Sequence, residues 1–356
     1  MKILIDINHA AHIHYFKNFS RIMIEKGHSV LFVVRDRENT LALIKSSGFD
    51  YVNKGRGASG LLGKLLKMPS VDYRLYRIAK EYGADLFLSY ASPYACVVST
   101  ILRKPCIALD DTEHAKFEHI MCRPLSDVTL SPYCYRARLW RGQQVFDSFL
   151  EMLYLHPNYY IPDEAAPGKL GLAPGQKYCI LRFVAWDANH DVGQHGLSAG
   201  EKKSLVKELS AYCRVFISSE SELDEELLPY RLDIHPSEFH DILYHSSLYI
   251  GEGSTTASEA ALMGVPSIYV NSLEVGYVDT EVEAGLAFHL HDYESVLKTA
   301  VGILSSPGAK DRFMQNRKQL LEKTIDPTAF LVWYVENWPR SRRMMKDNPD
   351  VQYNFR

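Results

Sequence analysis

Short apolar runs alternate with amphipathic stretches from one end of the chain to the other. A short, continuously apolar run predicts a strand buried in a sheet, and apolar residues three or four positions apart predict a helix with one buried face. Their alternation is typical of parallel strands joined by helical crossovers. The pattern predicts strands at residues 2–7, 29–34, 85–89, 106–109, 128–130, 178–183, 215–218, 248–250 and 267–270. It predicts helices at residues 14–26, 39–47, 94–102, 199–212, 239–246, 256–263 and 293–304.

A proline-rich segment separates two such series. Proline interrupts helices and interior strands, and four prolines fall in one irregular stretch: Pro157, Pro162, Pro167 and Pro174. We therefore expect an α/β protein with two Rossmann-like domains, residues 1–160 and 161–325, whose parallel sheets face each other across a cleft. Residues 326–345 are expected to form a helix that returns toward the first domain, and the polar residues 346–356 a frayed tail.

Composition narrows the classes of protein. A chain of 356 residues is long enough for two α/β domains. With 40 basic and 43 acidic residues the net charge is −3, so we expect no nucleic-acid partner. The sequence opens directly into a strand, without a signal segment or a long apolar run, and this predicts a cytoplasmic protein. The six cysteines form no CxxC pair and are expected to be buried free thiols.

A glycine-rich turn between a predicted strand and a predicted helix indicates an anion site, in the segment LYIGEGSTTASEAALMGVPSIYV. Gly251 and Gly253 let the backbone approach a ligand, and the start of the next helix offers unpaired N–H groups to a diphosphate. The hydroxyls of Ser254, Thr255 and Thr256 add donors. Glu259, about one turn further, could accept hydrogen bonds from two adjacent ribose hydroxyls. Alternatively, these residues only cap the helix, with Glu259 completing a capping box.

The loop after the first strand, DINHAAHIHYF, contains no glycine, so the GxGxxG fingerprint of an NAD-dependent dehydrogenase is missing. It carries His9, His12 and His14 instead, at the strand end where ligands bind in such sheets. An imidazole there could act as a general base, or only cap the helix or face solvent. Asp110, Asp111 and Glu113 follow another strand of the same half. They could orient an acceptor or assist the base, or only be solvated loop carboxylates.

The loop after strand 178–183 holds the densest group of polar side chains, in RFVAWDANHDVGQHG. Arg182 could stabilise a departing diphosphate, and His190 or His195 could bind phosphate or the sugar. Two alternatives remain: a purely structural loop, or a metal set formed by Asp187, His190, Asp191 and His195. We expect no metal at this site.

The stretch GEGSTTASEAALMGVP resembles the donor-site motif of GT-B glycosyltransferases, in particular the N-acetylglucosaminyltransferase that completes the lipid-linked peptidoglycan precursor. Ser258, Glu259, Gly264 and Pro266 stand in register with that motif, which implies that Glu259 holds the ribose. The resemblance continues more weakly through RGASGLLGKLL, DLFLSYASPYACVVSTILRKPCIAL and the opening loop. There His12 matches the histidine of a Gly-Gly-His turn, which implies that His12 is the general base.

The whole chain also resembles a family of unknown function placed near GT-B enzymes and hydrolysing UDP-N-acetylglucosamine 2-epimerases. The peptidoglycan enzymes carry a glutamine pair after the donor helix, whereas this chain reads NSLEVGYVDTEVEAG there. The identity of the sugar and of the base therefore stays open, with uridine as the family's default.

These observations predict a metal-independent GT-B glycosyltransferase without a cofactor, which moves a sugar from a nucleotide-diphosphate sugar to a hydroxyl of a surface glycan or lipid-linked saccharide. A hydrolysing UDP-N-acetylglucosamine 2-epimerase and a non-catalytic nucleotide-sugar-binding module are the alternatives. Leucines mixed with Lys64, Lys67, Arg74 and Arg77 indicate either peripheral contact with the inner face of an anionic membrane or an ordinary surface helix.

Overall fold

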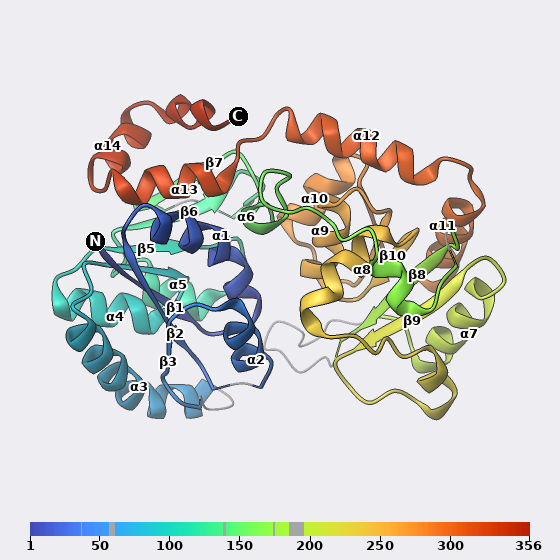
Figure 1. Cartoon of the computed structure of the whole chain (residues 1–356), viewed down its shortest axis with the longest axis horizontal. Helices are drawn as coiled ribbons and strands as arrows, with labels where there is room; N and C mark the ends of the chain where they lie inside the picture. Colours follow the sequence, from blue (N-terminus) through green and yellow to red (C-terminus); the bar gives the residue numbers. More distant parts are fainter. Residues whose placement is uncertain (37, 57–60, 138–139, 174, 185–195) are drawn as a thin grey trace. The chain divides into compact units, whose positions relative to one another are not determined.

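The computed structural model describes residues 1–36, 38–56, 61–137, 140–173, 175–184 and 196–356, and it divides into two compact units. The first unit joins Met1–Tyr159 to Thr324–Arg356, and the second is Tyr160–Lys323. The chain thus leaves the first unit within the proline-rich segment and returns to it after the second unit is complete (Figure 1).

The first unit is built on a parallel sheet in the order β3-β2-β1-β4-β5-β6-β7 (Figure 1). The strand order reverses between β1 and β4, because the chain first adds strands on one side of β1 and then crosses to the other side. The strands are β1 (Lys2–Ile7), β2 (Ser29–Val34), β3 (Tyr51–Asn53), β4 (Leu86–Tyr90), β5 (Cys106–Leu109), β6 (Val128–Pro132) and β7 (Gln143–Phe146).

Helices cover both faces of this sheet (Figure 1). On one face α1 packs against α2, α6 and α13, and on the other α4 packs against α3 and α5. Because both faces are covered, β1 and β2 are each buried over all but their first residue. The helices are α1 (Ala11–Glu25), α2 (Glu38–Ser47), α3 (Leu61–Tyr82), α4 (Pro93–Leu102), α5 (Lys116–Cys122), α6 (Met152–Leu155), α13 (Pro327–Glu336) and α14 (Arg340–Asp347), followed by the 3-10 helix η4 (Pro349–Phe355).

The second unit carries a smaller parallel sheet in the order β12-β11-β10-β8-β9, with its reversal between β8 and β10 (Figure 1). Its strands are β8 (Tyr178–Phe183), β9 (Arg214–Ser219), β10 (Leu248–Gly251), β11 (Ser267–Val270) and β12 (Ala287–Leu290). The predicted bounds of β1, β2, β5, β8 and β11 are confirmed residue for residue.

Helices α7 and α11 pack together on one face of this sheet, where they share an apolar core with β8, β9, β10 and β11. Helix α9 packs against α10 and α12. The helices are α7 (Ala199–Leu209), α8 (Phe239–His245), α9 (Ser254–Leu262), α10 (Gly276–Glu283), α11 (Tyr293–Ser305) and α12 (Ala309–Leu321), with the 3-10 helices η1 (Ala166–Leu170), η2 (Glu225–Tyr230) and η3 (Pro236–Glu238).

The end of the chain differs from the expected frayed tail. Residues 340–356 form α14 and η4, and the side chain of Gln352 is buried, with its Oε1 accepting a hydrogen bond from the Asp147 backbone N–H at 2.7 Å. The ring of Phe355 packs on Phe330 and Trp333 of α13, with centroids 5.9 and 5.4 Å away. The prediction that the end of the chain frays was wrong because it rested on the number of polar residues there. A few apolar residues, such as Phe355, instead decide the packing of this segment on α13.

Helix α3 occupies the stretch in which leucines and basic residues mix. Its Met68 and Leu75 are buried, whereas Leu66 and Tyr73 are exposed. In the described part of the chain, no helix is long and apolar enough to cross a membrane. All six cysteines are free thiols, and five of them are buried, as the sequence predicts.

Candidate functional site

Ligands of open parallel sheets bind beyond the carboxyl ends of the strands, where the strand order reverses. In the second unit this point lies at the ends of β8 and β10, and in the first unit at the ends of β1 and β4. The predicted site residues that fall in the described part of the chain follow these edges or the neighbouring strand β5.

The turn after β10 delivers the chain directly into α9. Gly253 is the N-cap residue, and no side chain caps the helix there. The free N–H groups of the first turn, together with the helix dipole, favour an anion at this end. Ser254 and Thr255 are half-buried beside it, and Tyr277 donates a hydrogen bond to Ser254 Oγ at 2.7 Å.

The alternative that these residues only cap the helix was wrong. None of the hydroxyls of Ser254, Thr255 and Thr256 caps α9, since the helix already begins at Ser254. Glu259 is the sixth residue of α9, in the second turn, where a capping box would need it in the first. Its carboxylate therefore takes no part in a capping box of α9.

Glycine is required at Gly251 because the ring of Tyr249 lies across it. A β-carbon at Gly251 would stand 2.0 Å from the Tyr249 hydroxyl, and Tyr249 is fully buried and has no room to move. At Gly253 a β-carbon would approach Val184 Cγ1 to 3.3 Å, which is tight but tolerable. The first glycine therefore serves packing against Tyr249, and a side chain at the second would crowd Val184.

Glu259 is held by a histidine that sequence analysis missed. His240 Nε2 lies 3.0 Å from Glu259 Oε1, and both side chains are largely buried. His240 stands at the start of α8, which ends just before β10. The sequence signal was a histidine near the start of a short amphipathic helix beside the glycine-rich turn, which alone does not distinguish it from a surface histidine.

Arg182 stands at the same edge of the sheet as the glycine-rich turn, because it pairs in register with Gly251 of the neighbouring strand. Its guanidinium donates hydrogen bonds to Ser218 Oγ at 2.7 Å and to Glu220 Oε1 at 2.9 Å. The cation also lies 5.8 Å from the centre of the Phe239 ring. Arg182 is thus anchored and partly exposed at the end of its strand.

A second missed residue, Glu252, fixes the turn itself. Its carboxylate is buried and forms an ion pair with Lys202 at 2.8 Å. It also accepts a hydrogen bond from the Val184 N–H at 3.2 Å, and its backbone carbonyl accepts one from Asn271 Nδ2 at 2.9 Å. Burial raises the pKa of Glu252, and Lys202 opposes that rise. Glu252 thereby ties the turn after β10 to α7 and to the ends of β8 and β11.

The other predicted members of this site, His190 and His195, lie outside the described residues, together with Trp186, Asp187 and Asp191. Within the ranges that the structure does describe, no group of three or more metal-ligating side chains is found.

In the first unit, the structure brings His12 and Asp111 to one tyrosine. His12 lies in the first turn of α1, half-buried, with its ring centroid 4.5 Å from that of Tyr90 at the end of β4. The Tyr90 hydroxyl donates a short hydrogen bond to Asp111 Oδ1 and lies 2.5 Å from Thr112 Oγ1. Among the three histidines of the loop, His9 Nδ1 accepts a hydrogen bond from the Ala11 N–H at 3.3 Å, but no side chain caps α1 at its N-cap residue Ala10.

Burial sets the electrostatics of this group. It raises the pKa of Asp111 to about 7, and the neighbouring carboxylates of Asp110 and Glu113 add to the effect, whereas the Tyr90 hydrogen bond opposes it. Burial and Asp111 together raise the pKa of Tyr90 well above its ordinary value, so Tyr90 keeps its proton. Asp111 therefore changes its protonation state near neutral pH.

Asp110 and Glu113 have other partners. Asp110 Oδ2 lies 2.8 Å from His119 Nε2, and His119 Nδ1 lies 3.2 Å from an Arg123 nitrogen. Glu113 accepts a hydrogen bond from the Arg136 N–H at 3.1 Å. Of the three predicted carboxylates, Asp111 is the one that is coupled through Tyr90 to His12.

Next to this group lies a buried ion pair that the sequence analysis did not single out. Lys54 donates a short hydrogen bond to Asp6 and another of 2.7 Å to Asn8 Oδ1, and Ser92 Oγ also donates to Asp6. Asp6 and Lys54 are both almost completely buried. The signal for Asp6 was an acidic residue inside an otherwise apolar strand.

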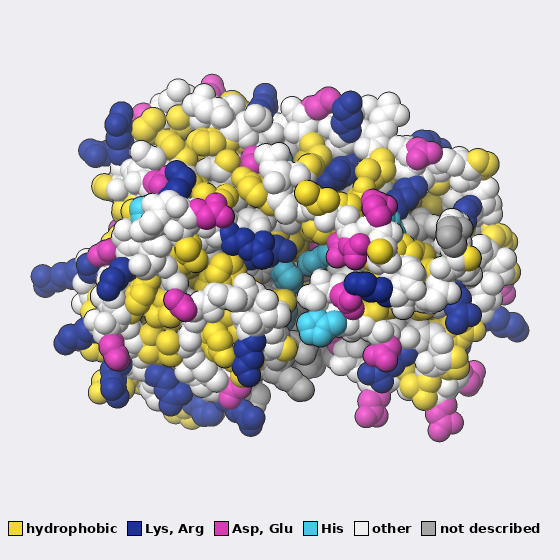
Figure 2. Space-filling view, in the orientation of Figure 1, with side chains coloured by type: hydrophobic (Ala, Val, Ile, Leu, Met, Phe, Trp, Pro, Cys, Tyr) yellow, Lys and Arg dark blue, Asp and Glu magenta, His cyan; other side chains and the backbone are white. Residues whose placement is uncertain are grey.

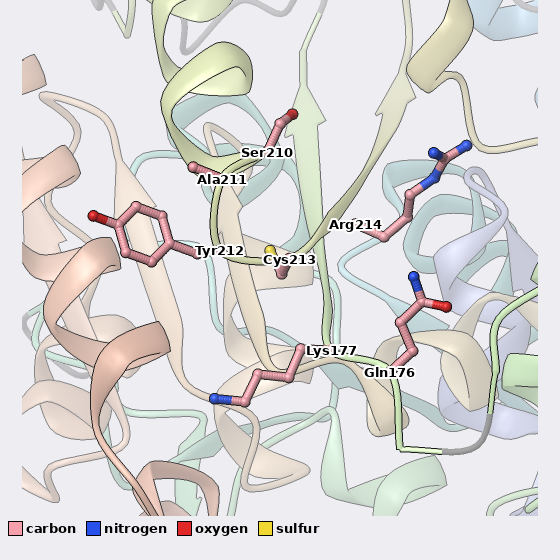
Figure 3. A pocket seen from close by; sticks show the side chains of 7 residues that line it. All are labelled: Gln176, Lys177, Ser210, Ala211, Tyr212, Cys213 and Arg214. Atoms are coloured by element: carbon pink, nitrogen blue, oxygen red, sulfur yellow. The ribbon is translucent and has the colours of Figure 1, made fainter.

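A pocket of about 440 Å³ lies in the second unit at Lys177 and Arg214, the residues that begin or precede β8 and β9. This is the amino end of the strands, opposite to the ligand edge of the sheet. Figure 3 shows that its side chains splay apart and do not converge on a common point. Figure 2 shows basic and acidic side chains interspersed on the face drawn, in keeping with the net charge of −3.

Comparisons with known proteins show a family model and several solved structures that this chain resembles. Residues 1–140 match a family described as "Protein of unknown function (DUF354)". The uncharacterized protein MJ0665 of Methanocaldococcus jannaschii is 23% identical over 318 residues, which cover 83% of this chain and 90% of that protein.

Several solved structures share the fold. The spinosyn rhamnosyltransferase SpnG, complexed with thymidine diphosphate, is 15% identical, with a TM-score of 0.62 over 95% of this chain and 100% of that one. The glycotransferase of kitacinnamycin is 12% identical, with a TM-score of 0.63 over 94% and 98% of the two chains. A Listeria monocytogenes protein described as a "putative UDP-N-acetylglucosamine 2-epimerase" is 12% identical, with a TM-score of 0.65 over 88% and 90% of the two chains. The fold of this chain is therefore the GT-B fold, as the sequence predicts.

Proposed function

We propose that this protein is a glycosyltransferase that takes its donor, a nucleotide-diphosphate sugar, at the start of α9. The observation that carries the proposal is the uncapped amino end of α9, followed in its second turn by the buried carboxylate of Glu259. An anion-binding helix start and a hydrogen-bond acceptor of this kind suit the two ends of a nucleoside diphosphate.

The donor would be bound in three places. The N–H groups after Gly253 and the hydroxyls of Ser254, Thr255 and Thr256 would bind the diphosphate, and Glu259 would accept hydrogen bonds from the ribose hydroxyls. Arg182 would exchange part of its contact with Glu220 for the departing diphosphate, whose negative charge grows as the bond to the sugar breaks. His190 and His195 are proposed as further contacts to phosphate or sugar.

The first unit would supply the base. His12 would take the proton of an acceptor hydroxyl while that oxygen forms a bond to the anomeric carbon and the nucleoside diphosphate leaves with the bonding electrons. Tyr90 would fix the plane of the His12 ring by contact, and Asp111 would fix Tyr90 by its hydrogen bond. The reaction requires no metal, and the proposed acceptor is a hydroxyl of a surface glycan or a lipid-linked saccharide, with UDP as the nucleotide carrier.

Hydrolysing 2-epimerisation is the second candidate, and one observation favours it. That reaction needs acid and base groups at neighbouring carbons of the sugar, and burial raises the pKa of Asp111 to about 7. A carboxyl group that titrates near neutral pH can serve in either role.

Nucleotide binding is the first test. UDP, ADP, GDP and CDP would be screened by thermal denaturation, since a ligand that binds the native state alone raises the melting temperature. We expect stabilisation of the wild type and of the matched control Glu294→Gln, whose carboxylate is exposed on α11. Glu259→Gln should lose most of this stabilisation. Equal stabilisation of Glu259→Gln, or none by any nucleotide, would overturn the proposal.

Turnover separates the two reactions. Incubation with UDP-N-acetylglucosamine alone would release UDP and N-acetylmannosamine if the protein is an epimerase. A transferase would instead release UDP in proportion to an added acceptor. Tight binding without turnover over a broad panel of donors and acceptors would identify a non-catalytic binding module.

A further inference from the structure

The contact between His240 and Glu259 joins two helices of the second unit at the proposed donor site. His240 Nε2 and Glu259 Oε1 are 3.0 Å apart, and the two side chains are 12% and 8% exposed. Because an ionised carboxylate only accepts hydrogen bonds, the proton of this bond belongs to Nε2. The contact therefore places a proton of His240 on Nε2 and limits the rotation of the Glu259 carboxylate.

Helix α8, which carries His240, is anchored at both ends. Asp241 accepts a hydrogen bond from the Tyr160 hydroxyl at 2.9 Å, next to the start of the helix. At the other end, Lys310 Nζ donates to the carbonyl of Ser246 at 3.1 Å and to that of Tyr244 at 2.5 Å. His240 thus reaches Glu259 from a fixed element, and this is what positioning a carboxylate requires.

The same end of α8 also contacts Arg182. Phe239 precedes His240, and its ring centre lies 5.8 Å from the Arg182 guanidinium carbon and 6.2 Å from the centroid of the His240 ring. Phe239 thus contacts Arg182, the proposed ligand of the diphosphate. Its neighbour His240 contacts Glu259, the proposed ligand of the ribose.

We propose that His240 is a positioning residue, which orients Glu259 so that it accepts both the 2′- and the 3′-hydroxyl of the donor's ribose. The site then takes ribonucleotide donors in preference to 2′-deoxyribonucleotide donors. This inference rests on the proposed function, and it narrows the substrate class of that site. A carboxylate has about four acceptor positions on its two oxygens, and the His240 bond takes one of them.

The preference for ribonucleotides over 2′-deoxyribonucleotides follows from the burial of the Glu259 carboxylate. A 2′-deoxyribonucleotide lacks the 2′-hydroxyl, so Glu259, which is largely cut off from water, would accept one hydrogen bond fewer. A site built to bind a hydroxyl rejects analogues without that hydroxyl. If Glu259 turned freely, it could compensate by rotating toward the remaining hydroxyl. The His240 bond prevents this rotation.

The test compares UDP with 2′-deoxy-UDP by isothermal titration calorimetry, or the best-stabilising nucleotide of the screen with its 2′-deoxy counterpart. The variants are His240→Gln, which keeps a donor at about the reach of Nε2, and His240→Asn, which is polar but too short. His240→Leu removes the donor altogether. The melting temperature of each variant without ligand reports whether it is folded.

We expect the wild type and His240→Gln to bind the ribonucleotide at least about tenfold more tightly than the deoxyribonucleotide, the size of one hydrogen bond to a charged group. In His240→Asn and His240→Leu the ribonucleotide should bind about tenfold more weakly and the preference should collapse. An unchanged preference in His240→Asn, or equal losses in His240→Gln and His240→Asn, would overturn the inference, even if His240→Leu does not fold.

Failure of this inference is distinguishable from failure of the proposed function. If the wild type binds no nucleotide, or if Glu259→Gln binds as the wild type does, the donor site itself is wrongly assigned. If Glu259→Gln loses affinity and His240→Asn does not, the donor site stands and only the role of His240 is refuted.

Discussion

Replacing Lys54 by methionine should destabilise the first unit strongly, because it leaves a buried carboxylate without its cation. Lys54 and Asp6 are 2% and 0% exposed, and they are joined by a direct hydrogen bond. In Lys54→Met, Asp6 would keep the hydrogen bond from Ser92 but would lose its counter-charge. Methionine fills a similar volume, so the packing changes little.

The expected magnitude follows from this geometry. Removal of one partner of a fully buried ion pair costs about 3–5 kcal/mol. In domains of this size, each kcal/mol lowers the melting temperature by about 2–4 °C, which gives a shift of roughly 6–20 °C. Asp6→Leu should cost less, because burial already lowers the pKa of Lys54, which can then become neutral. Replacing both residues by apolar ones should restore part of the loss.

Differential scanning calorimetry of the wild type, Lys54→Met, Asp6→Leu, the double variant and a control would measure these effects. The control is Lys45→Met, since Lys45 is exposed on α2. A Lys54→Met transition within about 1 °C of that of the control would refute the reasoning. So would a double variant whose loss of stability equals the sum of the two single losses.

Two further predictions concern carboxyl groups whose pKa is raised by burial. Glu281, which accepts a hydrogen bond from Ser258, has its pKa raised to about 8. The folded state keeps that proton while the unfolded chain loses it, so stability should fall as the pH rises from 5 to 8, by up to about 4 kcal/mol. Glu281→Gln should lack this decline in urea unfolding, and parallel pH profiles would contradict the assignment. In Tyr90→Phe, Asp111 loses the hydrogen bond that holds its pKa down. Because Asp111 would act on His12 only through that hydrogen bond, the limb of the kcat/KM profile near pH 7 should disappear, and an unchanged limb would exclude Asp111 from the proposed reaction.

Much of the candidate site could be found from sequence because ligand sites of parallel sheets follow strand ends. Strand β10 was recognisable from its apolar run, and the glycine-rich turn behind it marked Gly253 through Glu259. The same logic marked the histidines that follow β1 and the acidic residues that follow β5, and the family resemblance then selected His12 among the histidines. Tyr90 stands at the end of β4 and satisfies the same rule, but a tyrosine closing an apolar run is equally suited to packing. His240 precedes its strand and therefore lay outside the rule.

The sequence by itself determined the alternation of strands and helices and the glycine-rich helix start that the proposed donor site needs. These depend on periodicity, glycine and proline, which act over a few neighbouring residues. Only the tertiary structure decided that Lys54 meets Asp6, that Tyr90 bonds Asp111, that His240 holds Glu259 and that the polar end of the chain packs on α13. Such pairs depend on which strands become neighbours and on how helices pack over them, and no local pattern carries that information.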